Sequence, residues 1–499
     1  MLGSTLVMGQ GEDRFYVCIY LEDGEPIGHR GGLNKEFPPK LKTKKEDFDD
    51  DSVPKVKRSG MDEICKQFIE VMMGYLEYVP IILQLAPLLS HQMVQRALTS
   101  FLEKNCNSCE REETRIIYEL SLQRFAAIRR FEENMLAAAS TSRTLPRLLT
   151  VGLVASLEYS LNLVMKEIAA RYPERIFGED RKLSVREVLQ FQSIEEVRET
   201  VINDEIDKAQ RDNFESQVDW ILGKSKLDPI FDKYPDWPKI IELFERRNLF
   251  VHANGIVNEH YLKARAKYKF TSQKEPRLGD ELHSGPKYYT ASVHHVIHFG
   301  AMLLQVVWRK IAPDETKLSD KSIGDLGYEL IARGQYKLAI RILEFAKELR
   351  NVSDDQRRRM NVVNLANAYK LSGDEKTSFR VLESLDWSAV SPEFKVSVAA
   401  IKGNVDDVVL LMKKIGVSGD FPSENYEQWP VFYGVRDDPK FVECFRSIFG
   451  VEYVPAARKQ AGIAQVLAWA EEQDISPDED ESPKIVESNV KLQPPQGEE

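Results

Sequence analysis

The segment DWPKIIELFERRNLFVHANG, residues 236–255, predicts a helix that carries charged side chains on its apolar side. Asp236 is suited to cap the start of this helix, and Pro238 fits its first turn. Apolar residues then recur at spacings of three and four, so they form a single stripe along the helix. Gly255 follows the last of them and predicts where the helix ends.

Three kinds of polar side chain meet near the end of this helix. Arg247 falls on the apolar stripe, where an unpaired guanidinium would carry a large desolvation cost. Glu245, Asn248 and His252 share the neighbouring face, because residues three and four apart stack on one side of a helix. An arginine, an amide and an imidazole at one helix edge indicate a site for phosphate chemistry.

A carboxylate upstream is expected to pair with this arginine. Residues 144–171 predict the most apolar helix of the chain, buried on most sides, and Glu158 lies in its middle. A buried carboxylate usually has a cationic partner, and Arg247 or Arg246 is the best candidate. The sequence is equally consistent with a Glu158 that reaches solvent at the helix edge.

Length and composition bound the remaining interpretations. The 499 residues predict about three structural units. A formal net charge of −11 argues against a protein that coats nucleic acid nonspecifically, so any RNA contact must rest on a local basic patch. Five scattered cysteines predict reduced thiols. The N-terminus does not have the pattern of a secretory signal, and the longest apolar run, residues 71–89, is broken by one glutamate and two prolines. We therefore expect a cytoplasmic protein that does not cross a membrane.

The two ends of the chain are weakly specified. Residues 1–60 predict an arm and linker, with a strand at 15–21 and a turn at 23–24 that allow a β-hairpin. Residues 61–139 predict a helical region. Residues 471–499 contain ten acidic residues and two lysines, so they predict a disordered acidic tail.

Helical patterns dominate the middle of the chain. They occur near 184–191, 194–210 and 214–223, and a last helix is expected from about 291 to 311. Together with the two helices described above, these predict an all-α bundle over residues 140–312.

Two local patterns have the spacing of metal ligands, and neither supports a metal site. Cys106 and Cys109 have the spacing of a zinc pair, but the chain has no second pair of this kind. His294 and His298 are four residues apart, but His295 stands where the zinc-protease pattern needs a glutamate, and a third ligand is not evident. We expect neither a metal nor another cofactor, and interpret these histidines as hydrogen-bonded helix residues.

A short basic segment follows the central helix. Residues 262–269 include Tyr268 and four cations, Lys263, Arg265, Lys267 and Lys269. Cations beside an aromatic ring can bind a phosphate backbone and stack on a base. A solvated basic helix end explains the same pattern at least as well, so RNA contact is one of two interpretations.

The C-terminal third contains a divergent repeat. Small and apolar residues recur at fixed offsets around Gly334, Gly373 and Gly403, which are 39 and 30 residues apart. Residues 318–420 therefore resemble the tetratricopeptide helix–turn–helix repeat, in which small residues let paired helices pack closely. Residues 421–470 predict a helical cap that closes the array. Such an array can hold a protein partner or receive a regulatory signal, but its pattern does not identify the ligand.

The run RRNLFVHANG, residues 246–255, resembles the motif of the HEPN superfamily of prokaryotic ribonucleases. Arg247 is followed by the polar Asn248, by apolar positions, by His252 and then by a glycine. The resemblance covers about residues 140–312 and includes the upstream apolar helix with Glu158. It implies a HEPN-like helical bundle, metal-independent RNA cleavage, a homodimer with a composite site, and a prokaryotic toxin or phage-defence setting.

The chemistry of these residues agrees with that implication. The 2′-hydroxyl of RNA can itself attack the adjacent phosphate, so neither a metal nor a protein nucleophile is required. His252 can act as general acid or base, Arg247 can stabilise charge on the phosphoryl oxygens, and Asn248 can orient the ring or the phosphate. Arg246 and Glu158 are expected to support them. Arg247 and His252 are about 140° apart around the helix, so two facing protomers would surround a phosphate better than one.

Two other interpretations stay open. In the first, Arg247 only pairs with Glu158 and His252 only ends the helix. In the second, the chain is a non-catalytic scaffold, in which a HEPN-like bundle and a repeat array bind a protein or RNA partner.

Overall fold

The computed structural model describes eleven stretches of the chain: residues 16–22, 25–32, 60–111, 116–119, 124–176, 183, 185–229, 233–270, 275–349, 354–417 and 421–454. The chain divides into two compact units, Met1–Lys57 and Arg58–Glu499. The linker expected after residue 32 and the acidic tail expected at 471–499 lie outside the described residues, as does the end of the expected cap.

The first unit contains a β-hairpin. Strand β1 (Tyr16–Glu22) pairs antiparallel with β2 (Glu25–Gly32), so that Tyr16 lies opposite Gly32 and Glu22 opposite Glu25. The register shifts between Tyr20 and Leu21. The turn expected at residues 23–24 lies outside the described residues, between the paired Glu22 and Glu25.

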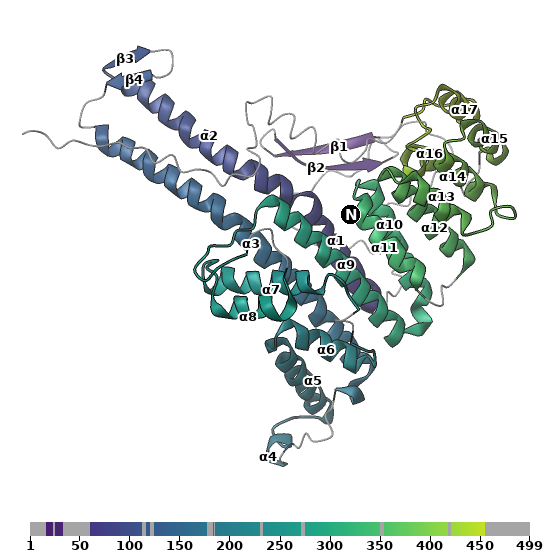
Figure 1. The fold of residues 1–499 in the computed structure, drawn as a ribbon, viewed down its shortest axis with the longest axis horizontal. Coiled ribbons are helices and arrows are strands. Elements are labelled where there is room, and N and C mark those ends of the chain that lie inside the picture. The colour runs from purple at the N-terminus through teal and green to yellow at the C-terminus, as the bar shows by residue number, and fades with distance from the viewer. Residues whose placement is uncertain are drawn as a thin grey trace, which may run out of the picture. The chain divides into compact units, whose positions relative to one another are not determined.

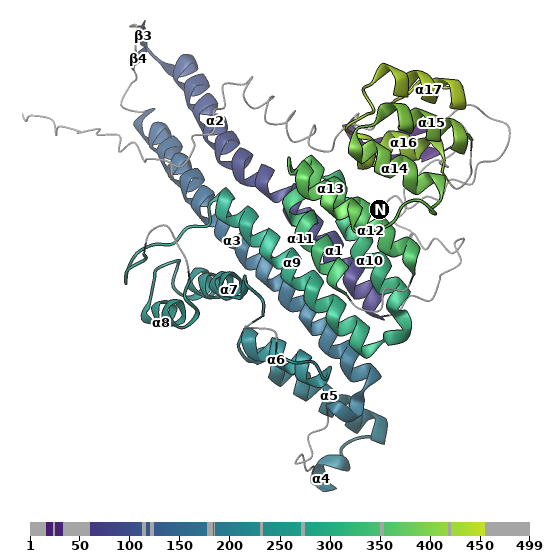
Figure 2. The ribbon, with the colours of Figure 1, turned by 45° about the vertical axis from the view of Figure 1, so that its right-hand side comes forward.

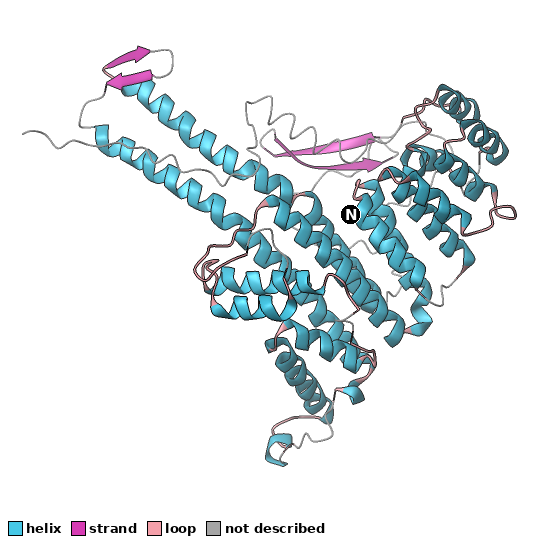
Figure 3. Cartoon of the chain, viewed as in Figure 1, coloured by secondary structure: helices cyan, strands magenta, loops and turns pink. Residues whose placement is uncertain are grey.

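The second unit is mostly helical and begins with three long helices (Figures 1 and 3). These are α1 (Gly60–Glu77), α2 (Val79–Asn105) and α3 (Phe125–Arg171). Helices α2 and α3 lie side by side, and the short strands β3 (Ser108–Arg111) and β4 (Ile116–Glu119) pair at their far end (Figure 2). The region expected to be only helical over residues 61–139 therefore includes a second hairpin.

Helix α3 runs through the boundary expected between residues 139 and 140. It is continuous from Phe125 to Arg171 and contains Pro146 in its interior. Helix α1 packs on both α3 and α9 (Pro286–Ile311), so residues from both sides of the expected boundary share one core.

Close packing of α1 on α9 depends on one glycine. A Cβ atom at Gly300 of α9 would lie 2.3 Å from Cζ of Phe68 of α1, so the Phe68 ring occupies the space that a side chain would need. Phe68 is fully buried. Helix α9 therefore acts as a central element that α1, α3 and α7 all contact.

Shorter helices follow α3 in the chain: α4 (Val185–Val188), α5 (Ile194–Arg211), α6 (Phe214–Lys224), α7 (Trp237–His252) and α8 (Glu259–Tyr268). Helices α5, α6 and α7 pack on α3, and α8 packs on α7. Short 3-10 turns η2 (Pro173–Arg175) and η3 (Pro313–Glu315) follow α3 and α9. Helix α3 is less enclosed than expected, because Leu148 and Tyr159 are exposed.

The C-terminal third consists of three helical hairpins. They pair α10 (Thr316–Ala332) with α11 (Tyr336–Glu348), α12 (Asp355–Leu371) with α13 (Glu375–Glu383), and α14 (Pro392–Lys402) with α15 (Val405–Ile415). Gly334, Gly373 and Gly403 lie in the three turns with φ of 73°, 93° and 73°. Only glycine adopts this left-handed conformation without strain, which explains why these three positions anchor the sequence pattern.

An aromatic cluster ends the described chain. Helix α16 (Ser423–Gln428), the 3-10 turn η4 (Pro430–Phe432) and α17 (Pro439–Phe449) pack around Tyr426. Its ring lies 4.9 Å from that of Phe421 and 5.1 Å from that of Phe432, measured between ring centroids. This cluster packs on α14 and α15.

Two described helical segments are long and apolar enough to cross a membrane by length and composition alone. They are Arg143–Arg171 within α3 and Pro286–Ile311, which is α9. In this structure 67% of the α9 segment and 44% of the α3 segment is buried against other parts of the protein.

Candidate functional site at the end of helix α7

Helix α7 runs from Trp237 to His252 as the sequence predicts, but its N-cap works differently. The Asp236 carboxylate makes no capping hydrogen bond to the backbone. It lies 2.9 Å from Nζ of Lys239 and also pairs with Arg341 of α11. Burial raises the pKa of Asp236, but the two cations lower it by more, so the pKa lies below its ordinary value. The carboxylate is therefore ionised, and its pairing with Arg341 links the start of α7 to α11.

Arg247 pairs with Glu158 across the contact between α7 and α3. Nη2 of Arg247 donates to Oε1 of Glu158, and of the two partners that the sequence suggested, this is the one present. Neither side chain is fully enclosed, since 22% of Arg247 and 31% of Glu158 is exposed. Burial raises the pKa of Glu158, and the charge of Arg247 opposes that rise. The pair fixes Arg247 at an edge that solvent reaches.

Arg246 belongs to a separate and more enclosed network. Its Nε donates to Oε1 of Glu242 at 2.7 Å, and its Nη1 donates to the carbonyl oxygen of His283 at 2.7 Å. The guanidinium carbon also lies 4.0 Å from the ring centroid of Tyr288. Tyr261 and Tyr288 both donate to Glu242, at 2.9 and 2.7 Å. The guanidinium of Arg246 is thus bound by groups within the chain, which gives this arginine a structural role.

His252 ends α7 and is exposed to solvent. Asn248, one turn earlier, hydrogen-bonds Glu245, whose Oε2 lies 3.2 Å from Nε2 of His260 on α8. Asn248 therefore has a hydrogen-bonding role within the face that it shares with Glu245. The arginine and the histidine of the motif are on one helix, one of them tethered to α3 and the other open to solvent.

The turn after His252 is held by a residue that the sequence analysis did not identify. Nη1 of Arg147 on α3 donates to the carbonyl oxygen of Asn254 at 3.0 Å and to its Oδ1 at 2.9 Å, and Nη2 pairs with Glu281. Asn254 and Gly255 have φ of 50° and 81°, a left-handed turn that this arginine braces. The 107 residues between Arg147 and Asn254 leave no local signal of the contact. Arg147 thereby braces the turn that follows His252.

The basic segment on α8 is largely paired within the chain. Lys263 lies 3.7 Å from Glu259, Arg265 lies 3.5 Å from Glu275, and Lys267 lies 3.2 Å from Glu215. Lys269 is exposed at the end of the helix and has a φ of 56°.

Tyr268 is not the free stacking ring that the sequence suggested. Its ring stacks on Phe270, with centroids 6.2 Å apart and planes 9° apart, and its hydroxyl donates to Glu215. These contacts favour the interpretation of residues 262–269 as a paired helix end.

The histidines of α9 have protein partners. Nε2 of His294 lies 3.2 Å from Oε1 of Gln335, and Nδ1 of His295 lies 3.5 Å from Asp236. Burial lowers the pKa of His294 and brings that of His295 to about 4.

His298 accepts a hydrogen bond from an arginine. Nη2 of Arg341 lies 2.8 Å from Nδ1 of His298, and because arginine can only donate, this nitrogen is unprotonated. The Tyr234 hydroxyl lies 2.9 Å from the same nitrogen. Burial, together with the charge of Arg341, lowers the pKa of His298 to about 4.

No three His, Cys, Asp or Glu side chains are grouped as metal ligands would be, within the part of the chain that the structure describes. Cys106 and Cys109 are both free thiols.

Exposed apolar side chains flank the motif. On α3 they are Leu148 and Tyr159, which are eleven residues apart and so share one helix face. On α7 and just after it they are Val251 and Ile256. Scattered single apolar residues are ordinary on a surface, but these four lie on the two elements that carry Glu158, Arg247 and His252.

Comparison of the chain with family models, with curated proteins and with solved structures gives no match.

Proposed function

We propose that this protein is a metal-independent endoribonuclease whose reacting residues are Arg247 and His252, with Asn248 in support. One observation carries the proposal: a single helix presents an arginine tethered by Glu158 and, five residues later, a solvent-exposed histidine. A charge-stabilising cation and a proton-transfer group are the two components that RNA transesterification needs.

The reaction proceeds without an external nucleophile. The 2′-oxygen attacks the adjacent phosphorus while the bond from phosphorus to the 5′-oxygen breaks. A base removes the proton of the 2′-hydroxyl and an acid gives a proton to the 5′-oxygen, so the products are a 2′,3′-cyclic phosphate and a 5′-hydroxyl. His252 takes one of these proton transfers, because imidazole exchanges protons near neutral pH. Arg247 donates to the phosphoryl oxygens as their charge grows.

We propose further that two copies of the chain form the site. In one copy Arg247 is directed to Glu158, and His252 is about 140° away around the helix. A second copy related by a twofold axis would bring another His252 to the same phosphate. The exposed Leu148, Tyr159, Val251 and Ile256 would supply the apolar contact of such an interface.

The setting that the sequence resemblance implies completes the proposal. Residues 140–312 would be a HEPN-like bundle, residues 318–420 divergent tetratricopeptide-like repeats that regulate it, and the protein a cytoplasmic prokaryotic toxin or phage-defence nuclease. The pairing of Asp236 with Arg341 supports communication between these two parts, because it links the start of α7 to α11.

The test is RNA cleavage by the full chain in EDTA, with wild type, Arg247→Ala and His252→Ala compared at equal concentration. We expect wild type to cut RNA and both variants to lose at least about 100-fold in rate, the usual minimum for a general acid–base group. Cleavage that EDTA abolishes, or that survives His252→Ala, would reject the proposal.

A second candidate is a non-catalytic scaffold that binds a protein or RNA partner. One observation favours it: Arg247 is already engaged by Glu158, while the cavity of about 680 Å³ lies among the C-terminal helices and not beside α7. The two candidates differ in the assay above, because a scaffold would bind without cutting.

A further inference from the structure

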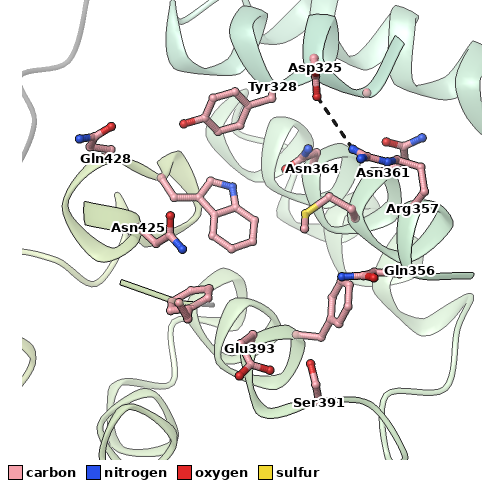
Figure 4. A pocket seen from close by; sticks show the side chains of 15 residues that line it. Asp325, Tyr328, Gln356, Arg357, Asn361, Asn364, Ser391, Glu393, Asn425 and Gln428 are labelled. Atoms are coloured by element: carbon pink, nitrogen blue, oxygen red, sulfur yellow. Dashed lines mark ion pairs between the residues drawn. The ribbon is translucent and has the colours of Figure 1, made fainter. Parts of the chain in front are cut away.

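A cavity lies among the C-terminal helices, away from the motif. Side chains from α10, α12, α14 and α16 converge on it, together with Phe421 and Trp429 (Figure 4). Its volume of about 680 Å³ is within the range of small-molecule sites. The proposed ribonuclease reaction makes no use of this cavity.

Two kinds of neutral side chain dominate the cavity wall. Five are carboxamides, each with a donor and an acceptor side by side: Gln356, Asn361, Asn364, Asn425 and Gln428. Four are aromatic rings: Tyr328, Phe394, Phe421 and Trp429. The wall has three charged side chains, Asp325, Glu393 and Arg357. Nη1 of Arg357 lies 3.9 Å from Asp325.

One of the carboxamides has a buried oxygen without a partner. Oδ1 of Asn361 makes no hydrogen bond to any described residue, and Asn361 as a whole is only 7% exposed. It lies against Gly324, where an added Cβ would be 2.8 Å from Oδ1. This oxygen is shielded from solvent where it stands, so a ligand that supplies an N–H group would bind it once the Asn361 side chain turns toward the cavity. A buried carbonyl oxygen without a donor is costly, which favours that rotation.

From these observations we propose that the cavity binds an uncharged nucleobase, carried by a free nucleoside or by RNA. A nucleobase has a flat face that stacks on aromatic rings. Adenine, guanine and cytosine also have an exocyclic amine beside a ring acceptor, which is the edge that Asn and Gln recognise with two hydrogen bonds. The Asn361 oxygen would accept from that amine.

Shape and charge distinguish this ligand from two others. The backbone of an extended peptide has no flat ring for the four aromatic side chains of the wall to stack on, whereas a nucleobase has one. A polyphosphate needs several cations, whereas two carboxylates and one arginine give the wall a formal excess of negative charge. Any phosphate of a bound nucleotide must therefore point to solvent.

Calorimetric titration of the full chain with adenosine, guanosine, cytidine and uridine tests the proposal. We expect saturable binding of at least one of the four, because each base offers an N–H group beside an acceptor to the carboxamides of the wall. The tetranucleotide of adenosine, titrated in parallel, distinguishes the sources: binding as tight as that of adenosine indicates an RNA base, and weaker binding indicates a free nucleoside.

The variants are Asn361→Ala, Gly324→Ala and a matched control on the same helix. Asn367→Ala also removes a buried asparagine of α12, 2% exposed, with an unpartnered Nδ2, but Asn367 does not line the cavity. We expect each of the first two to weaken nucleoside binding at least about tenfold and the control to leave it unchanged. Gly324→Ala tests the proposal even if Asn361→Ala does not fold. Alanine stabilises the helix relative to glycine, and its Cβ atom displaces Oδ1 of Asn361.

Three results would overturn the proposal. They are no heat of binding for any nucleoside at about 1 mM, the weak limit of a specific site; binding that Asn361→Ala does not change; and binding of tetra-alanine, which offers only backbone amides, without binding of nucleosides.

Discussion

The end of α7 and the cavity among the C-terminal helices are opposite kinds of site. At α7 the charged side chains have partners within the chain, and His252 stands exposed between apolar neighbours. In the cavity most lining side chains are neutral, four helices contribute to the wall, and a buried oxygen has no described partner. The first arrangement suits a site completed by a second copy of the chain, and the second suits a ligand bound by one copy.

The largest effect is expected from His252→Ala. Loss of the proton-transfer group should lower RNA cleavage by about 100- to 10,000-fold, without a change in nucleoside binding at the cavity. The matched control is His260→Ala on α8, which removes another exposed histidine from the same neighbourhood. Equal losses in rate for the two variants would show that His252 has no special role.

Neighbouring arginines should differ in what they stabilise. Arg246 is 14% exposed, pairs with Glu242 and packs on Tyr288, so Arg246→Ala should lower the free energy of unfolding by about 3–5 kcal/mol. Arg247 and Glu158 are more exposed, so Arg247→Ala should cost only about 1–2 kcal/mol while it removes cleavage. Urea unfolding and cleavage, measured on both variants, check this. A larger unfolding cost for Arg247→Ala would assign Arg247 a structural role.

A charge at the apolar flank should separate the two copies. Tyr159→Lys and Leu148→Lys replace exposed apolar side chains on α3, so the fold of one copy should be unaffected. Loss of one buried apolar side chain from an interface corresponds to about 10- to 100-fold weaker self-association. Analytical ultracentrifugation should show monomers, with cleavage reduced in parallel and nucleoside binding retained. A wild type that is monomeric at all concentrations would contradict the composite site.

The histidines that join α9 to α7 and α11 should make the folded protein less stable in acid. His298 has a pKa of about 4 in the folded protein, below its ordinary value of 6.5, because it is buried beside Arg341. Between these two pH values the unfolded chain binds more protons, so stability is complete above pH 6.5 and falls toward pH 4. At pH 5 this histidine alone should lower the free energy of unfolding by about 2 kcal/mol. Between pH 7 and pH 5 the free energy of unfolding of His298→Gln should therefore fall by about 2 kcal/mol less than that of wild type. Urea unfolding at the two pH values checks the difference, and identical losses would show that His298 is protonated when folded.

Local sequence patterns predicted the bounds of helices and turns better than the contacts between them. The bounds of α7 follow from Asp236, Pro238 and the spacing of its apolar residues, and the C-terminal glycines mark turns that need positive φ. The pairing of Glu158 with Arg247 was also within reach, because a carboxylate on an apolar helix requires a cation.

Contacts between distant segments could not be predicted in the same way. Arg147 reads as one more cation near a helix start, and only the fold brings it to Asn254. Only the fold shows that helix α3 runs through residue 140 with Pro146 in its interior. The carboxamides of the cavity come from two helices far apart in the chain, α12 and α16, so the sequence shows each one only as an isolated polar residue.

The chemical ends of the RNA fragments test the central claim most directly. Wild-type protein is incubated with RNA in EDTA, and the fragment ends are identified by mass spectrometry. Attack by the 2′-hydroxyl, assisted by Arg247 and His252, predicts 2′,3′-cyclic phosphates and 5′-hydroxyls. Fragments with 5′-phosphates, or RNA that stays intact in EDTA at protein concentrations where the dimer forms, would contradict the account.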